Sequence, residues 1–112
     1  MKKRFYKTVK VEVNDITYLD KSFFIDYYIL ESRKSTGEKG YERSFGIEAV
    51  KRYTDYFGNN VVQEARLSSV TGDEDEIEAF VSYAAKENVL PDDIDIFCDE
   101  YFGSDALCKS AV

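Results

Sequence analysis

Apolar and polar residues alternate along several segments in the first 70 residues, and this period of two is typical of strands with one buried face. The segments cover residues 5–13, 22–33, 41–53 and 61–70. In the first segment, the side chains expected to share one face are Phe5, Val9, Val11 and Val13. Turn-forming residues separate the segments, which predicts an antiparallel β-meander. Residues 16–19 are either a fifth strand or a loop, and Gly46 predicts a bulge or a close packing contact.

The period changes to that of a helix after residue 70. Thr71 is expected to be the N-cap, with Glu74 three residues later completing a capping box. The apolar stripe of this helix consists of Ile77, Phe80, Val81 and Ala84. A second helix is expected to begin at Pro91, which suits a first helical position, and to end at Gly103. Its apolar stripe consists of Ile94, Phe97, Cys98 and Tyr101.

These elements predict an α+β fold: an antiparallel β-meander of four to five strands followed by two short C-terminal helices packed on one face of the sheet. A chain of 112 residues has the length of one domain. We expect that domain to span residues 1–103, with residues 104–112 as a frayed tail.

Three short motifs in the second half of the chain carry a family resemblance. They are Phe45-Gly46-Ile47-Glu48, Ser69-Val70-Thr71 and Asn88-Val89-Leu90-Pro91. Over residues 41–102 the chain resembles a family of small uncharacterised proteins from low-GC Gram-positive bacteria, known as a domain of unknown function. The resemblance implies the order strand, strand, helix, helix and a bacterial cytoplasmic setting. It implies no activity, cofactor or catalytic residue, and the chain departs from the pattern at the acidic pair Asp92-Asp93.

Charge is distributed unevenly along the chain. Residues 1–60 hold 12 basic and 9 acidic side chains, whereas residues 61–112 hold 3 basic and 13 acidic ones, which gives the net charge of −7. The acidic half argues against a nucleic-acid partner, because binding to phosphates requires cations. No apolar run is long enough for a membrane span or for the core of a signal peptide. We therefore expect a cytoplasmic protein without a membrane partner.

The sequence holds little catalytic chemistry. It has no histidine, which excludes Ser-His-Asp and Cys-His nucleophile systems. Cys98 lies on an apolar stripe beside acidic residues, which predicts a buried structural thiol, while Cys108 in the tail is expected to be exposed. No phosphate-binding glycine motif or EF-hand spacing occurs. The sequence therefore favours a protein without catalytic activity, and it predicts no cofactor and no metal site.

The density of large apolar residues on both faces of segment 22–33 is the clearest positive signal. Its second face carries Phe24, Tyr28 and Leu30, and we expect these three to form an interface if they are not part of the core. This hypothesis describes a non-catalytic protein–protein interaction module that binds a protein partner or a second copy of itself. The alternative is a domain that binds a small molecule or a divalent metal, with the acidic helices and a pocket between sheet and helices. A third reading is binding of single-stranded nucleic acid by the basic N-terminal strand.

Overall fold

Each of the four alternating segments forms one strand of a single antiparallel sheet. We describe a computed structural model, which covers residues 1–12, 22–35, 37, 40–55 and 57–103. The strands are β1 (Lys2–Val11), β2 (Phe23–Ser35), β3 (Tyr41–Thr54) and β4 (Asn60–Thr71). Each strand pairs antiparallel with the next one along the chain, in the order β1-β2-β3-β4, so the predicted meander is confirmed. Residues 16–19 and the tail at 104–112 lie outside the described residues.

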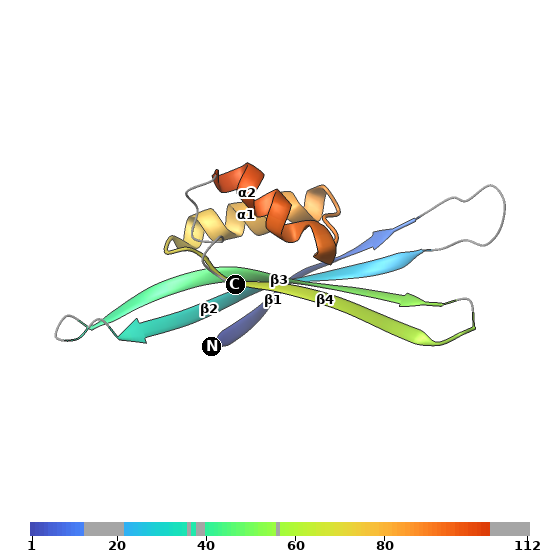
Figure 1. Cartoon of the computed structure of the whole chain (residues 1–112), viewed down its shortest axis with the longest axis horizontal. Helices are drawn as coiled ribbons and strands as arrows, with labels where there is room; N and C mark the ends of the chain where they lie inside the picture. The colour runs from blue at the N-terminus through green and yellow to red at the C-terminus, as the bar shows by residue number, and fades with distance from the viewer. Residues whose placement is uncertain (13–21, 36, 38–39, 56, 104–112) are drawn as a thin grey trace.

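Helices cover the middle of one face of the sheet (Figure 1). They are α1 (Glu74–Lys86), the short 3₁₀ turn η2 (Pro91–Asp93) and α2 (Ile94–Phe102). The strands are longer than the helix layer, so the hairpins extend beyond it at both ends of a molecule with extents of 61 × 26 × 22 Å (Figure 1). The prediction of an α+β fold with two C-terminal helices on one face is confirmed.

The apolar core fills the space between the helices and the sheet. Strand β2 contributes Ile25, Tyr27 and Ile29, because alternate residues of a strand point to the same face. The predicted stripe of α1 is fully buried against them. From α2, Ile94 and Cys98 are buried, Phe97 is half-buried, and Tyr101 is 42% exposed. The predictions of both stripes and of a buried Cys98 are therefore confirmed, with Tyr101 as the exception.

Helix α1 begins later than the sequence predicted. The expected cap at Thr71 is wrong, because Asp73 is the N-cap and its carboxylate accepts hydrogen bonds from the backbone N–H groups of Asp75 and Glu76. Thr71 is the last residue of β4, where it pairs with Phe45 of β3. Aspartate is the stronger N-cap of the two, and Thr71 is held in the sheet by its pairing with Phe45, so both effects favour Asp73.

The second helix starts at Pro91, as predicted, but its first turn has 3₁₀ geometry. The regular helix α2 follows and ends at Gly103, whose positive φ of 86° favours glycine.

Two irregularities bend the sheet. In β1 the register with β2 shifts between Phe5 and Lys7, which adds Tyr6 as an extra residue. A one-residue insertion reverses the side to which the preceding residues point. Phe5 therefore lies on the face opposite to Val9 and Val11, and the prediction that it shares their face is wrong.

The second irregularity is at Gly46 of β3, where the register with β4 shifts between Phe45 and Ile47. A Cβ atom at Gly46 would lie 1.9 Å from the backbone oxygen of Leu67. Gly46 alone stands opposite Ser68, Ser69 and Val70, so the extra residues lie on β4, and the predicted close contact at Gly46 is confirmed.

Candidate functional site

The three predicted interface residues share the face of β2 that points away from the helices, which we call the open face. Phe24 is 38% exposed, Tyr28 is half-buried and Leu30 is fully buried, with 0% exposure. The interface prediction is therefore wrong at Leu30, which offers no surface to a partner. An interface role for Phe24 and Tyr28 remains a prediction.

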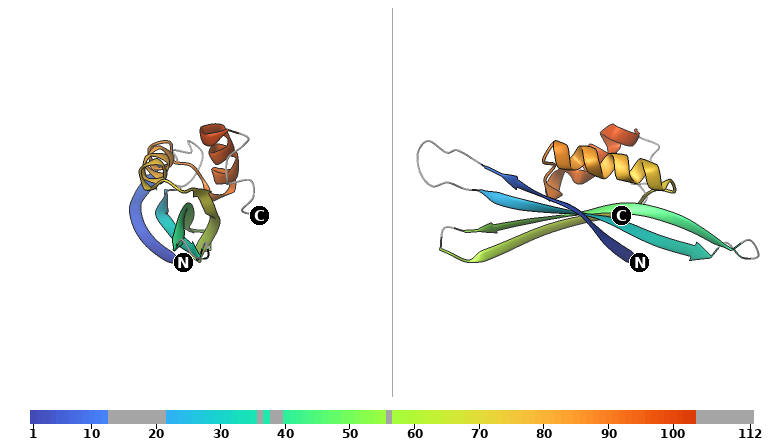
Figure 2. Two further views of the ribbon diagram at one scale, coloured as in Figure 1. Left: turned by 90° about the vertical axis from the view of Figure 1, so that its left-hand side faces the viewer. Right: turned by 180° about the vertical axis from the view of Figure 1, so that it is seen from behind.

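Curvature of the sheet explains the burial of Leu30. The end-on view in Figure 2 shows a strongly bent sheet with both helices on one side. On the open face, Lys3 of β1 extends past β2 and places its Nζ atom 3.0 Å from Oε1 of Glu48 on β3. Arg66 of β4 places its Nη1 atom 4.0 Å from Sδ of Met1. The two outer strands thus approach each other over the open face and cover its centre.

Glu48 is a buried carboxylate at the centre of the open face, with a relative exposure of 2%. Its Oε2 atom accepts hydrogen bonds from Nε and Nη2 of Arg66, at 2.9 and 2.7 Å. Burial alone would raise the pKa of Glu48, but hydrogen bonds from Lys3 and Arg66 hold that pKa below its usual value. Lys3 also lies 4.6 Å from the centre of the Tyr28 ring. This network connects all four strands.

A second carboxylate, Asp26, is held in the same way further along the open face. It accepts hydrogen bonds from the Thr8 hydroxyl and from Nε and Nη2 of Arg52, the last two at 2.6 and 3.0 Å. Burial would raise the pKa of Asp26, but these donors lower it overall. Carboxylates with lowered pKa values are ionised at neutral pH and are poor general acids or bases. The carboxylates of Glu48 and Asp26 therefore have a structural role, in which they join neighbouring strands through hydrogen bonds.

The described residues do not bring a metal site together. Among them, no group of three or more Asp, Glu, Cys or His side chains is arranged to hold a metal ion. Cys98 is buried in the core, and Cys108 lies outside the described residues. In the part of the chain that the structure covers, no helix is long and apolar enough to span a membrane.

A shallow groove lies on the helix layer, between the C-terminal end of α1, the following loop and α2. Its volume is about 410 Å³. The residues that line it are Tyr83, Glu87, Asn88, Val89, Leu90, Asp93, Ile96, Phe97 and Glu100. Ile96 is 58% exposed and Tyr83 is 44% exposed, so two large apolar side chains face solvent here. We call this feature the helix-layer groove.

Aromatic rings connect the groove to the core. The rings of Tyr83 and Phe97 are stacked, with their centres 5.3 Å apart and their planes at 14°. Phe97 in turn stacks on Phe80, which is fully buried, at 5.6 Å. The aromatic surface of the groove is therefore fixed by packing and does not have to be ordered when a partner binds.

The loop that closes one end of the groove is also fixed. Asn88 adopts a left-handed conformation with φ of 54°, which ends α1. The next residue, Val89, donates its backbone N–H to the oxygen of Ala84 and accepts a 2.7 Å hydrogen bond from the hydroxyl of Tyr27. Tyr27 is buried, and burial raises the pKa of its hydroxyl, so it stays protonated as the donor. A strand residue thus holds the loop against the sheet.

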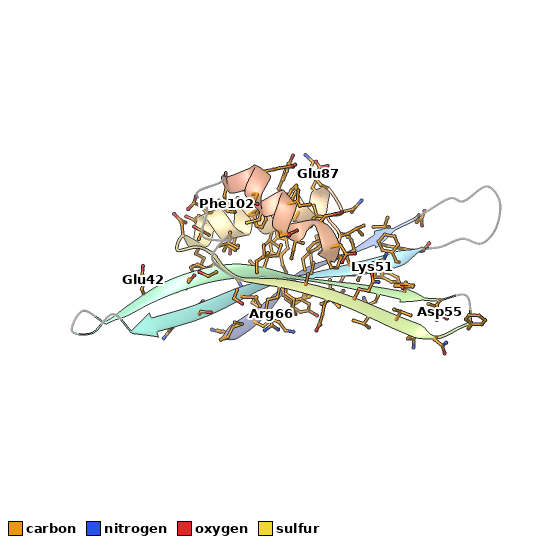
Figure 3. All side chains as sticks on the ribbon, viewed as in Figure 1. Glu42, Lys51, Asp55, Arg66, Glu87 and Phe102 are labelled. Carbon is orange, nitrogen blue, oxygen red and sulfur yellow. The ribbon has the colours of Figure 1, made fainter. Side chains whose placement is uncertain are left out.

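The rim of the groove is acidic. Glu87, Asp93 and Glu100 line it, and none of the described residues that line it is basic. Residues 73–103 as a whole contain 11 acidic side chains and a single basic one, Lys86. Figure 3 shows Glu87 on the side of the helix layer away from the sheet, while Arg66 lies beneath the sheet. The molecule therefore presents an acidic, partly apolar surface on its helix side.

Sequence reasoning missed this groove because it assigned the apolar residues of the second helix to the core stripe. One signal was available in the sequence. Ile96 falls outside the stripe of Ile94, Phe97 and Cys98, and it is an apolar residue among acidic neighbours. An isoleucine at that position is expected to be exposed, as it is in the structure.

Comparison of the chain with models of known protein families, with curated proteins and with solved structures gave no match. The resemblance over residues 41–102 therefore remains a prediction.

Proposed function

We propose that this chain is a non-catalytic protein-interaction module that uses the helix-layer groove to bind a basic segment of a partner with an apolar anchor. The observation that carries the proposal is the exposure of Ile96 and Tyr83 beside a rim of three carboxylates. The groove thus replaces the open face, where Leu30 is buried, as the expected binding surface.

Two properties of the groove support a protein partner. Interface centres are enriched in aromatic residues, and a partner's apolar side chain would bury Ile96 and Tyr83, which are exposed in the free protein. The stacked rings and the fixed loop need little ordering on binding, which favours affinity.

The acidic rim determines the charge of the partner. Carboxylates around an apolar centre attract cations and repel acidic segments, which sets specificity and speeds association. The partner segment is therefore expected to carry lysine or arginine on both sides of its apolar anchor.

Selection from a displayed random-peptide library on the immobilised protein tests the proposal. We expect enriched peptides to contain basic residues around an apolar residue. Their affinity should fall at least about tenfold for the variant Ile96→Ser, which corresponds to about 1.4 kcal/mol of lost apolar contact. Fluorescence anisotropy with labelled peptides measures the affinity.

Val62→Ser is the matched control, because Val62 has the same 58% exposure as Ile96 but lies on β4, away from the groove. The control should bind the selected peptides as the wild type does. Peptides without basic residues, or peptides that bind Ile96→Ser and the wild type equally well, contradict the proposal.

A further inference from the structure

We propose that the segment bound in the helix-layer groove is the β1 edge of a second copy of this chain, so that copies associate head to tail. This inference rests on the proposed function, because it names the partner of the same groove. It follows from the chemistry of β1, which matches that of the groove.

Strand β1 is an edge of the sheet, paired on one side with β2. Between Lys2 and Val11 it carries five cations, Lys2, Lys3, Arg4, Lys7 and Lys10, and no acidic residue. Lys2 and Lys7 form no salt bridge with any residue that the structure describes. Phe5 and Tyr6 are 57% and 36% exposed. The edge therefore presents exposed aromatic residues and available cations, with Phe5 opposite Tyr28 on the open face and Lys7 opposite Tyr27 on the helix side.

The groove offers the complementary surface. Its exposed apolar residues, Tyr83 and Ile96, are surrounded by Glu87, Asp93 and Glu100. An exposed aromatic residue of β1 can therefore contact Ile96 while lysines of the same strand approach the acidic rim. Such contacts between exposed charges weaken as salt rises, because the screening length falls from about 8 Å at physiological salt to about 3 Å at 1 M.

Symmetric pairing of two β1 edges is disfavoured by the same charges. It would bring two sets of five cations together without a single acidic residue in either strand. Lysines and a bulge on an edge strand are known to prevent such pairing, and β1 has both. Contact between unlike surfaces is heterologous, so an assembly that does not close into a ring leaves one groove and one edge unoccupied at its ends.

Mixing two variants tests this arrangement. The edge variant Lys2→Glu/Lys7→Glu keeps its groove, but its edge now carries two acidic residues beside the three remaining cations. The groove variant Ile96→Lys keeps its edge but carries a cation in the groove. All three positions are exposed, so both variants are expected to fold, which circular dichroism verifies. In sedimentation velocity we expect each variant to be a monomer alone, and the mixture to form one-to-one dimers that grow no further.

The wild type should form larger assemblies as its concentration rises and should dissociate at high salt. A wild type that stays monomeric up to its solubility limit overturns the inference, as does a mixture that stays monomeric or a variant that still self-associates alone. The proposed function is tested separately. If selected basic peptides bind the groove of a monomeric wild type, the function stands and only the second copy is wrong as partner.

Discussion

The two faces of the sheet are both closed to solvent at their centres, but by different means. On the helix side, α1 and α2 cover Ile25, Tyr27 and Ile29 with apolar side chains. On the open face, no helix among the described residues covers the sheet, and the sheet itself bends until Lys3 and Arg66 meet at Glu48. One face is therefore stabilised mainly by apolar burial, and the other by curvature and buried ion pairs.

The difference has a consequence for function. Ion pairs that hold neighbouring strands occupy the charged groups of the open face, so that face has few groups left for a partner. The helices carry a surplus of acidic residues, of which Glu74 and Glu78 form salt bridges with Arg4 of β1 or Arg43 of β3. Binding is thus expected on the helix layer, although the sheet carries more aromatic residues.

The largest loss of stability is expected from a substitution that forces β3 and β4 apart where their backbones lie very close together. In Gly46→Ala, the new Cβ would lie 1.9 Å from the backbone oxygen of Leu67, and no flexible side chain is there to move aside. We expect a loss of about 4 kcal/mol or more in the free energy of unfolding, measured by urea denaturation.

Gly72→Ala is the control for this prediction. Its Cβ would approach the backbone oxygen of Arg43 only to 3.5 Å, an ordinary contact. If the two variants had similar free energies of unfolding, the close approach of Gly46 to Leu67 would not limit the stability of the sheet.

A smaller loss of stability should distinguish Leu30 from Phe24. The sequence pattern predicted that both residues belong to one interface. Leu30→Ala removes a fully buried side chain and should lower the free energy of unfolding by about 2–5 kcal/mol. Phe24→Ala removes a side chain that is 38% exposed, and we expect it to lose clearly less. Urea denaturation of both variants measures the difference, and equal losses would contradict the assignment of Leu30 to the interior.

These two residues also mark the limit of prediction from the sequence. Alternation correctly predicted the strands and placed Phe24 and Leu30 on one face, because strand period is a local property. Their unequal burial depends on Lys3 and Arg66, which approach from the two outer strands. Register shifts at Tyr6 of β1 and opposite Gly46 on β4 accompany this curvature. The position of Gly46 was predictable, whereas the size of its effect was not.

The helix layer shows the same division between local and long-range information. The stripes of both helices were predictable from spacing alone. The start of α1 was not, because Thr71 and Asp73 can both cap a helix and the pairing of Thr71 with Phe45 is one of the two effects that favour Asp73. The groove was not predictable either, since it depends on the hydrogen bond from Tyr27 to Val89, whose residues are far apart in the sequence.

The smallest loss of stability is expected on the open face, where ion pairs join the strands. Glu48→Gln keeps the shape of the side chain but removes its charge, and at neutral pH we expect a loss of about 1–2 kcal/mol. The value is at the low end for a charged hydrogen bond, because Lys3 and Arg66 are about half exposed and can be hydrated when the charge is lost. Glu64→Gln is the control, because Glu64 is exposed and forms no salt bridge with a described residue.

The pH dependence of the stability difference between the wild type and Glu48→Gln shows whether the lost charge or altered packing causes it. The folded protein holds the pKa of Glu48 below its ordinary value of 4.5, so the unfolded chain takes up a proton first as the pH falls. The stabilisation is complete above about pH 4.5 and is lost as the pH falls through the pKa of the folded state. Urea midpoints of the wild type and Glu48→Gln should therefore differ at about pH 7 and converge once the pH falls below the folded-state pKa of Glu48. A difference that stays constant with pH would mean that the substitution acts through packing, and the open face would then owe its stability to curvature alone.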